Sequence, residues 1–268
     1  MFALPIYKEI SMTFETIIFD KGVDRVATIT LNRPKQMNSF NQQMLNDMRD
    51  AWRIVREDDD INAVVLRSVP GRAFCTGVDV IEEIDLFPND PFRERDPGEL
   101  LGPKMNLVWK PVITAVHGLC AGGAFYFLNE SDIIICAEDA QFFDPHVSFG
   151  KVPACEPIGA SHRMPYGEIM RMILMGNAER IGAATALRIS LVSEVTATDK
   201  LWDRAHEIAR SIASRPSTAT QGAVRALWES LDLPYSAALR GSYKYTQVGN
   251  PISTLDRASV QKEPFVIR

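Results

Sequence analysis

A pair of glycines, Gly122 and Gly123, stands in the stretch HGLCAGGAFYF, directly after an apolar run. Glycine lets another molecule come close to the backbone, and the N–H groups at a helix start attract negative charge. Rigid backbone donors of this kind stabilise an oxygen that gains negative charge during a reaction. Phe125 and Tyr126 follow, where a catalytic acid would be useful. The stretch predicts a cradle for an oxyanion without an obvious acid in it.

Composition limits the class of protein. The 268 residues are enough for one large domain, or for a core with a small appendage. A hydrophobic share of 46% and a charged share of 24% are ordinary for a soluble enzyme and argue against disorder or a fibre. The net charge is −5 and the basic residues are scattered, so we expect no nucleic-acid partner.

Targeting and cysteine signals are weak. No apolar run approaches the roughly 20 residues of a membrane span, and the N-terminus does not read as a signal peptide. We therefore expect no membrane partner and a cytoplasmic location. The four cysteines form no C-x-x-C pair, which favours reduced thiols. The histidines and cysteines show no metal-ligand spacing, so we predict no metal.

Elements that would position the glycine pair can be read from hydrophobic patterns. Residues 16–31 read as a β-hairpin. Met44, Met48, Trp52 and Val55 form one apolar helix face, with Asn41 or Ser39 as its cap. Three apolar runs are typical of strands covered on both faces: 63–69, 110–118 and 132–137. A helix is expected from about Gly123 to Glu130, and the last third of the chain reads as helical. This order predicts an α/β core with a C-terminal helical part.

The sequence contains two candidate segments for covering a binding site or a neighbouring subunit. Residues 82–103 are rich in proline and charge, which predicts a surface loop or lid. Its apolar residues are candidates for the lining of an apolar tunnel: Ile84, Leu86, Phe87 and Phe92. The tail after residue 242 can pack on a neighbouring subunit.

Four blocks of this sequence resemble the crotonase superfamily, the enoyl-CoA hydratase/isomerase proteins. They are TLNRPKQMNSF, GRAFCTGVDV, KPVITAVHGLCAGGA and ERIGAATALRISLVSEV, in the family's order between about residues 13 and 215. The resemblance implies an α/β spiral of ββα units with a C-terminal helical region, here residues 1–200 and 201–268, the latter used in trimerisation or as a lid. It also implies a homotrimer or hexamer, and coenzyme A as part of the substrate rather than as a separate cofactor.

The resemblance assigns roles to the glycine blocks. The backbone N–H groups of Val78 and Gly123 would be the two oxyanion donors for an acyl-CoA thioester, and Gly77 and Gly122 would shape the two turns. The residues that would lie near the CoA are Met37, Arg72, Ala73 and Phe74, together with both of these turn glycines. Arg72 could meet a phosphate group. A solvated loop charge is the alternative for Arg72, and plain turn formation is the alternative for the glycines.

Both glutamates that a hydratase of this family uses are absent. In the register of the resemblance, the first position is Tyr126 and the second is His146, in the triplet Asp144-Pro145-His146. Paired carboxylates can divide base and acid work between them. A tyrosine and a histidine cannot do this in the same way, but His146 can act as a base and Tyr126 as a donor or orienting group. Simple packing is the alternative for both side chains.

Several acids are candidates to assist His146. The candidates are Asp79, Asp144, Glu156 and Glu130. Asp79 is common in the family and often structural. Glu130 lies one helical turn after Tyr126, where an ion-paired structural acid is the alternative. Glu156 falls about two residues from a place where some family isomerases keep a catalytic acid.

Three classes of function remain open at this point. The first is an acyl-CoA enzyme with isomerase or hydrolase-like chemistry that depends on His146, rather than an efficient hydratase. The second is a CoA-ester binding protein that has lost its catalytic turnover or retains only residual turnover. The third is a purely structural trimer, which gives no reason to keep both glycine blocks.

Overall fold

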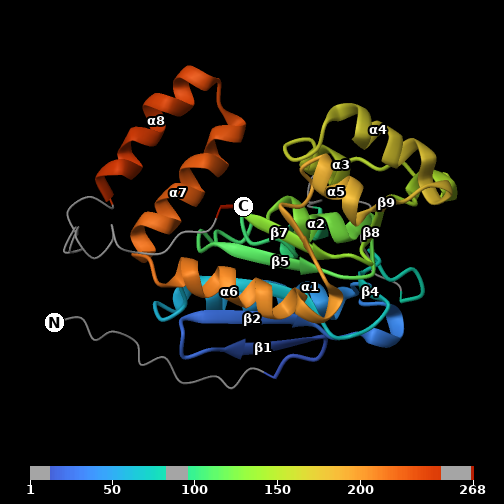
Figure 1. Ribbon diagram of the computed structural model, residues 1–268, viewed down its shortest axis with the longest axis horizontal. Coiled ribbons are helices and arrows are strands. Elements are labelled where there is room, and N and C mark those ends of the chain that lie inside the picture. Colours follow the sequence, from blue (N-terminus) through green and yellow to red (C-terminus); the bar gives the residue numbers. More distant parts are fainter. Residues whose placement is uncertain (1–12, 83–95, 249–266) are drawn as a thin grey trace.

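The computed structural model describes residues 13–82, 96–248 and 267–268. Within these ranges the strands form two sheets (Figure 1). The larger sheet, in spatial order, contains β1 (Ile17–Lys21), β2 (Val26–Leu31), β3 (Ala63–Ser68), β5 (Val112–Val116), β7 (Ile133–Ala137) and β10 (Glu194–Thr196). The smaller sheet contains β4 (Ala73–Cys75), β6 (Leu119–Ala121), β8 (Gln141–Phe143) and β9 (Ile181–Gly182).

The chain passes repeatedly from the larger sheet to the smaller one. β3 leads to β4, β5 leads to β6, and β7 leads to β8, and within each sheet these strands pair in parallel. A helical segment follows each strand pair: the 3-10 turn Pro97–Leu100, the helix α2 (Phe125–Asn129) and the helix α3 (Cys155–Ala160). Each unit therefore adds one strand to both sheets. The α/β spiral of ββα units that the sequence predicted is confirmed.

The predicted hairpin and first helix are also confirmed. β1 and β2 pair antiparallel, with Ile17 opposite Leu31. The helix α1 spans Gln42–Glu57, and the Oδ1 atom of Asn41 accepts the N–H of Met44 at 2.9 Å, as expected of an N-cap. Trp52 on its apolar face is fully buried, and its indole N–H donates to the carbonyl of Leu101 at 2.8 Å.

The helix α6 (Leu201–Ala213) covers the outer face of the larger sheet (Figure 1). Its small buried residues Ala205 and Ala209 pack against alternate strand residues such as Val65 and Ile113. The intervening positions, such as Val64, face the other way into the main core. This alternation is what two-sided burial of a parallel strand requires. The proposed boundary after residue 200 stays a prediction, and α6 packs tightly on the sheet that precedes it.

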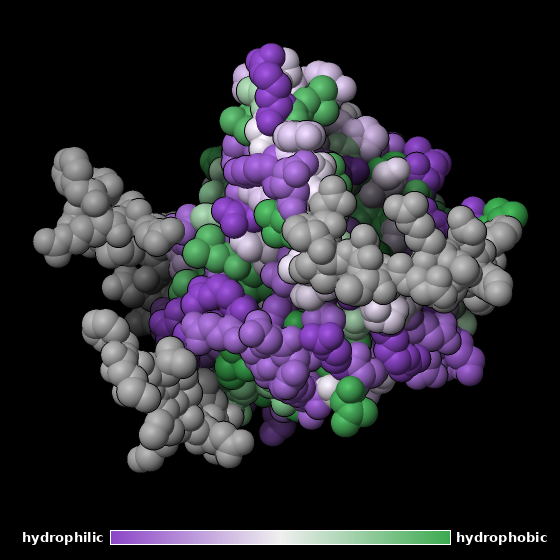
Figure 2. Space-filling view, turned by 90° about the vertical axis from the view of Figure 1, so that its left-hand side faces the viewer, coloured by the Kyte–Doolittle hydropathy of each residue, from purple (hydrophilic) through white to green (hydrophobic). Residues whose placement is uncertain are grey.

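The remaining helices lie beyond the sheets (Figure 1). They are α4 (Tyr166–Met175), α5 (Ala183–Arg188), α7 (Ser217–Glu229) and α8 (Tyr235–Val248). α7 and α8 pack on each other and expose large apolar side chains such as Leu227 and Tyr243. Figure 2 shows a face where hydrophilic residues predominate and hydrophobic ones are scattered. No helix of the described ranges is long and apolar enough to cross a membrane. The apolar residues assigned to the lid, Ile84, Leu86, Phe87 and Phe92, lie outside the described residues.

Candidate active site

The turn after β4 directs one backbone N–H away from its neighbours. The N–H of Phe40 donates to the carbonyl of Gly77 at 2.9 Å, and the N–H of Asp79 donates to the carbonyl of Phe40 at 2.9 Å. Phe40 therefore pairs with Val78 as in a parallel bridge. Because both bonds use the residues that flank Val78, the N–H of Val78 points to the opposite side of the chain.

The two glycine turns lie in direct contact. Gly77 has a φ of +87°, and a Cβ atom there would lie 3.0 Å from the backbone nitrogen of Gly123. A Cβ atom on Gly123 would lie 2.7 Å from the ring of Phe40 and 3.4 Å from the Cα of Gly77. Neither site has room for a larger residue without displacement. This close approach brings the backbone of Val78 next to that of Gly123.

Gly123 stands at the start of a helical segment. The 3-10 turn Gly122–Ala124 continues directly into α2, so the N–H of Gly123 lies in its first turn. Gly122 has a φ of +52°, and a Cβ atom on it would lie 3.4 Å from the Cε1 atom of His146. The predicted helix is thus present, one residue longer at its start and one shorter at its end. The imidazole of His146 lies beside the glycine pair.

His146 is held between two acids. Its Nδ1 atom and its backbone N–H both face Oδ1 of Asp144, at 2.7 and 2.9 Å. Asp144 is fully buried, and its second oxygen has no partner among the described residues. The Nε2 atom of His146 lies 3.8 Å from Oε1 of Glu156. The hydrogen bond that His146 donates to Asp144 raises the pKa of His146 more than burial lowers it.

This arrangement fixes the orientation of the ring. Asp144 accepts the Nδ1–H, so Nε2 is the nitrogen left to exchange a proton. A buried carboxylate that orients an imidazole also stabilises the imidazolium that forms when the ring takes up a proton. Glu156 is itself 8% exposed, and burial raises the pKa of its carboxyl group. The structure therefore brings together His146, Asp144 and Glu156, three of the predicted candidates.

Tyr126 is paired with an acid that sequence reasoning missed. Its hydroxyl donates to Oδ2 of Asp96 at 2.7 Å. Its ring lies against Gly98, where an added Cβ would meet the ring at 2.3 Å. Burial, and then the charges of Glu156 and Asp96, raise the pKa of Tyr126 far above its usual range. Asp96 lies among several other charged residues of the proline-rich loop, and no pattern distinguishes it from them.

Asp79 is engaged in structural hydrogen bonds. Its carboxylate accepts the N–H groups of Ile81 and Glu82 at 3.0 and 3.3 Å, and Nη1 of Arg33 at 2.9 Å. Burial works against the charged carboxylate, but these bonds outweigh it and lower the pKa of Asp79. Both side chains are buried. The ion pair fixes the chain directly after Val78.

Glu130 faces a different loop. Its Oε2 atom accepts the backbone N–H groups of Lys104 and Met105, at 2.5 and 3.0 Å. Burial raises the pKa of Glu130 to about 7. Its hydrogen-bond partners are backbone amides, and the charge of Lys104 also favours its carboxylate form.

The predicted CoA-binding residues differ in how accessible their side chains are to a ligand. Met37 is 37% exposed and Arg72 is exposed. The side chains of Ala73 and Phe74 are buried, and Phe74 packs edge-to-face on Phe127 with ring centroids 6.0 Å apart. Only the backbone of Ala73 and Phe74 is therefore left for contact with a ligand. Within the described residues no cluster of side chains fits a metal ion.

The sheets and their repeated units define the fold of crotonase-like proteins. An enoyl-CoA hydratase/isomerase from Mycobacterium paratuberculosis superposes with a TM-score of 0.83 at 34% identity, covering 94% of this chain and 97% of the other. An enoyl-CoA hydratase assigned in Streptomyces coelicolor superposes with a TM-score of 0.80 at 26% identity, covering 98% of each chain.

The sequence comparisons agree with the fold. The model of the family described as enoyl-CoA hydratase/isomerase matches residues 22–262. A probable enoyl-CoA hydratase of Mycobacterium leprae is 33% identical over 223 residues, 82% of this chain and 84% of the relative. The (E)-benzylidenesuccinyl-CoA hydratase of Thauera aromatica is 32% identical over 231 residues, 84% of this chain and 89% of the relative. The chain belongs to the enoyl-CoA hydratase/isomerase family.

Proposed function

We propose that this chain is an acyl-CoA enzyme that performs isomerase or hydrolase-like chemistry with His146, and that it is not an efficient hydratase. The observation that carries the proposal is the position of His146. Its ring lies beside Gly122, its Nδ1 is bonded to buried Asp144 at 2.7 Å, and its Nε2 is directed toward Glu156. A base with a defined orientation next to two backbone donors suits proton transfer near a polarised carbonyl.

The thioester oxygen binds between the N–H groups of Val78 and Gly123 in this proposal. The N–H of Val78 points away from Phe40, and Gly123 opens a helical segment. These donors stabilise either an enolate or a tetrahedral oxyanion, because both place negative charge on the same oxygen. His146 then takes a proton from carbon in the first case, or from water in the second.

In the register of the resemblance, Tyr126 stands where hydratases of this family would offer a glutamate. The hydroxyl of Tyr126 is already committed to Asp96, and its raised pKa makes it a poor acid and no base at neutral pH. The pair can orient a substrate but cannot replace the two carboxylates that water addition uses. This is the reason to expect slow hydration even though relatives are named as hydratases.

The test is product analysis with a panel of CoA thioesters in D₂O, using the native chain and His146→Ala. The panel contains a straight enoyl-CoA, a dienoyl-CoA and a cyclic β-keto acyl-CoA. Deuterium at a carbon next to the thioester would report an enolate, and a free thiol or a ring-opened acid would report hydrolysis. Loss of the product in His146→Ala is expected. Rapid hydration of crotonyl-CoA by the native chain would contradict the proposal.

A CoA-ester binding protein is the second candidate. The hydrogen bond that Tyr126 donates to Asp96 favours this second function, because the bond occupies one of the acids of the site. Tight binding of several thioesters, with no product and no deuterium uptake, would support this second function. The His146→Ala variant would then bind as the native chain does.

A further inference from the structure

The outer face of the larger sheet changes from apolar to polar side chains at the carboxyl ends of β3 and β5. Alternate positions on this face are buried apolar residues beneath α6: Ala63, Val65, Ile113 and Ala115. The next alternate positions are Arg67 and His117. Because both strands run parallel, these two side chains lie at the same edge of the sheet. The first turn of α6 contributes Trp202 at the same place.

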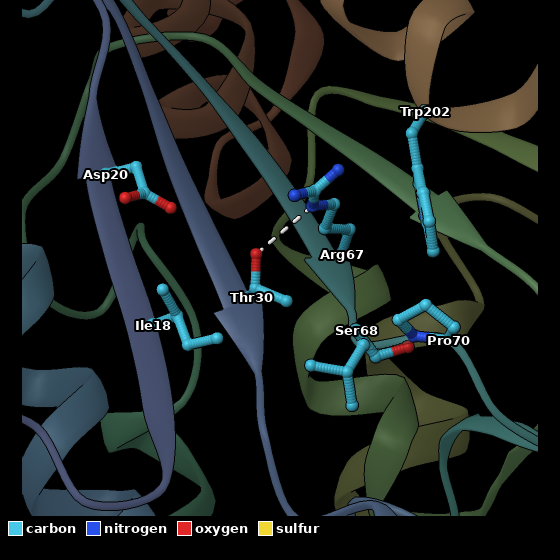
Figure 3. Close-up of a pocket in the computed structure, with 8 residues that line it drawn as sticks. Ile18, Asp20, Thr30, Arg67, Ser68, Pro70 and Trp202 are labelled. Atoms are coloured by element: carbon cyan, nitrogen blue, oxygen red, sulfur yellow. Dashed lines mark hydrogen bonds between the residues drawn. The ribbon is translucent and has the colours of Figure 1, made fainter.

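Two small adjoining cavities occupy this edge. The first has a volume of about 230 Å³ and is lined by Asp20, Thr30, Arg67 and Trp202 among others (Figure 3). The second has a volume of about 120 Å³ and is lined by His117 and Trp202 among others. They share Pro70 and Trp202 as lining residues. In Figure 3 the guanidinium of Arg67 lies between Thr30 and the indole of Trp202.

Several buried hydrogen-bonding groups around these cavities lack a well-aligned partner among the described residues. His117 is only 5% exposed, and neither of its ring nitrogens forms a well-aligned hydrogen bond with a described residue, although the backbone of Gly71 lies close to the ring. The buried indole N–H of Trp202 likewise lacks an acceptor among the described residues. Buried polar groups are nearly always paired, so these atoms indicate a missing partner.

Arg67 adds a positive charge with donors to spare. Its Nε–H donates to Oγ1 of Thr30 at 3.1 Å, and its guanidinium carbon lies 4.9 Å from the centre of the Trp202 ring. Its two Nη groups form no hydrogen bond with another residue of the described ranges. Burial lowers the pKa of Arg67, an effect that the charge of Asp20 opposes.

We propose that the two cavities form a binding site for a small oxyanion, a carboxylate or a phosphate group, held by Arg67, Trp202 and His117. The guanidinium, the indole N–H and one imidazole N–H all donate, and an oxyanion accepts from several donors at once. The 3-10 turn Thr198–Lys200 runs directly into the thirteen-residue helix α6, and the start of this helical segment, which has no side-chain cap, also favours negative charge.

The acids nearby limit what can enter. Asp20 lines the first cavity and Asp139 the second. Asp139 accepts the N–H of Gly118 at 3.3 Å. These carboxylates repel an anion, so a bound anion must lie close enough to Arg67 for the guanidinium charge to outweigh them. Both cavities are smaller than the roughly 300–1,000 Å³ of drug-sized ligand pockets. The site suits a compact anion, not a CoA thioester, and it stands independently of the proposed function.

The test is an NMR titration of the indole N–H resonances. Sodium phosphate and sodium acetate are added separately to the full chain at constant ionic strength, and Trp202→Phe identifies the Trp202 resonance. A saturable shift of that resonance with either anion is expected, and comparison of the two arms shows whether phosphate or carboxylate is preferred. No shift with either anion, or an equal shift with sodium chloride, would overturn the proposal.

Matched variants locate the effect. Arg67→Met should weaken binding at least about tenfold, because it removes the charge-assisted bonds. Arg225→Met is the control, since this guanidinium lies 5.1 Å over the ring of Trp109 but lines neither cavity. It should leave binding unchanged. If Arg67→Met does not fold, His117→Phe takes its place. This variant keeps an aromatic ring but has neither ring nitrogen, and it should weaken binding by a similar factor. Unchanged binding in a folded Arg67→Met or His117→Phe protein would overturn the proposal.

Discussion

The glycine turns and the side chains around His146 lie next to each other but are held by different means. The turns are fixed by contact: Gly77 and Gly123 leave no room for a Cβ, and Arg33 bonds Asp79 directly after Val78. The residues around His146 are fixed by charge, because buried acids set its orientation and its pKa. Activity should therefore be sensitive to the size of the side chains at the glycine turns, and to pH and charge around His146.

The largest effect is expected from Gly123→Ala. The new methyl group would meet the ring of Phe40 at 2.7 Å and displace one oxyanion donor. The rate on any thioester substrate should fall about 10²–10³-fold, as for the loss of one such donor. The comparison is with Gly167→Ala, which meets nothing within 4 Å and should keep the native rate. A native rate in Gly123→Ala would remove this turn from the mechanism.

Asp79→Asn should mainly cost stability. It leaves the buried guanidinium of Arg33 with only the partly exposed Glu82 as its acid partner, and the free energy of unfolding should fall by about 3 kcal/mol. The folded-state pKa of Asp79 is lowered, so its contribution is present above its unfolded pKa of about 4 and is lost as pH falls through the lower folded value. Urea unfolding at pH 7 and pH 3 measures this: the variant and the native chain should differ less at pH 3. Equal stability at pH 7 would contradict the assigned role.

Asp144→Asn tests the region that depends on charge. Since the Asp144 carboxylate raises the pKa of His146, the variant should show a lower pKa for this imidazole. The neutral base then forms at lower pH, and the rising limb of the pH–rate profile should move to lower pH. The plateau rate should fall about a hundredfold, because the imidazolium loses its stabilising carboxylate. NMR titration of His146 in the native chain and in the variant reports the pKa. An unchanged profile would mean that His146 is not the base.

Tyr126→Phe should have the smallest effect. It removes the hydrogen bond to Asp96 and keeps the ring against Gly98. The rate should fall less than about tenfold, and the free energy of unfolding by about 1 kcal/mol. Steady-state kinetics on the substrate found with the thioester panel measures this. A loss as large as that of His146→Ala would instead make Tyr126 the proton donor.

Local patterns predicted the regular elements well. Strand and helix periods placed β2, α1 and the buried strands, and Asn41 caps its helix as expected. These elements depend on the spacing of apolar residues and on caps, which neighbours in sequence determine. Several short helical segments were not anticipated, among them α3 and the 3-10 turn Pro97–Leu100. They are too short for a periodic pattern to show.

The order of residues along the chain is enough to establish that two glycine blocks exist and that Tyr126 and His146 follow them. The acids that meet these side chains become known only when the chain is folded. Asp144 is two residues from His146 along the chain, but Glu156 reaches it from α3, and Asp96 reaches Tyr126 from 30 residues away. The cavities beside Arg67 and His117 are likewise formed by two strands and a helix that lie far apart along the chain. Hydrogen bonds and desolvation act over a few ångströms of space, and a residue's place along the chain does not encode that distance.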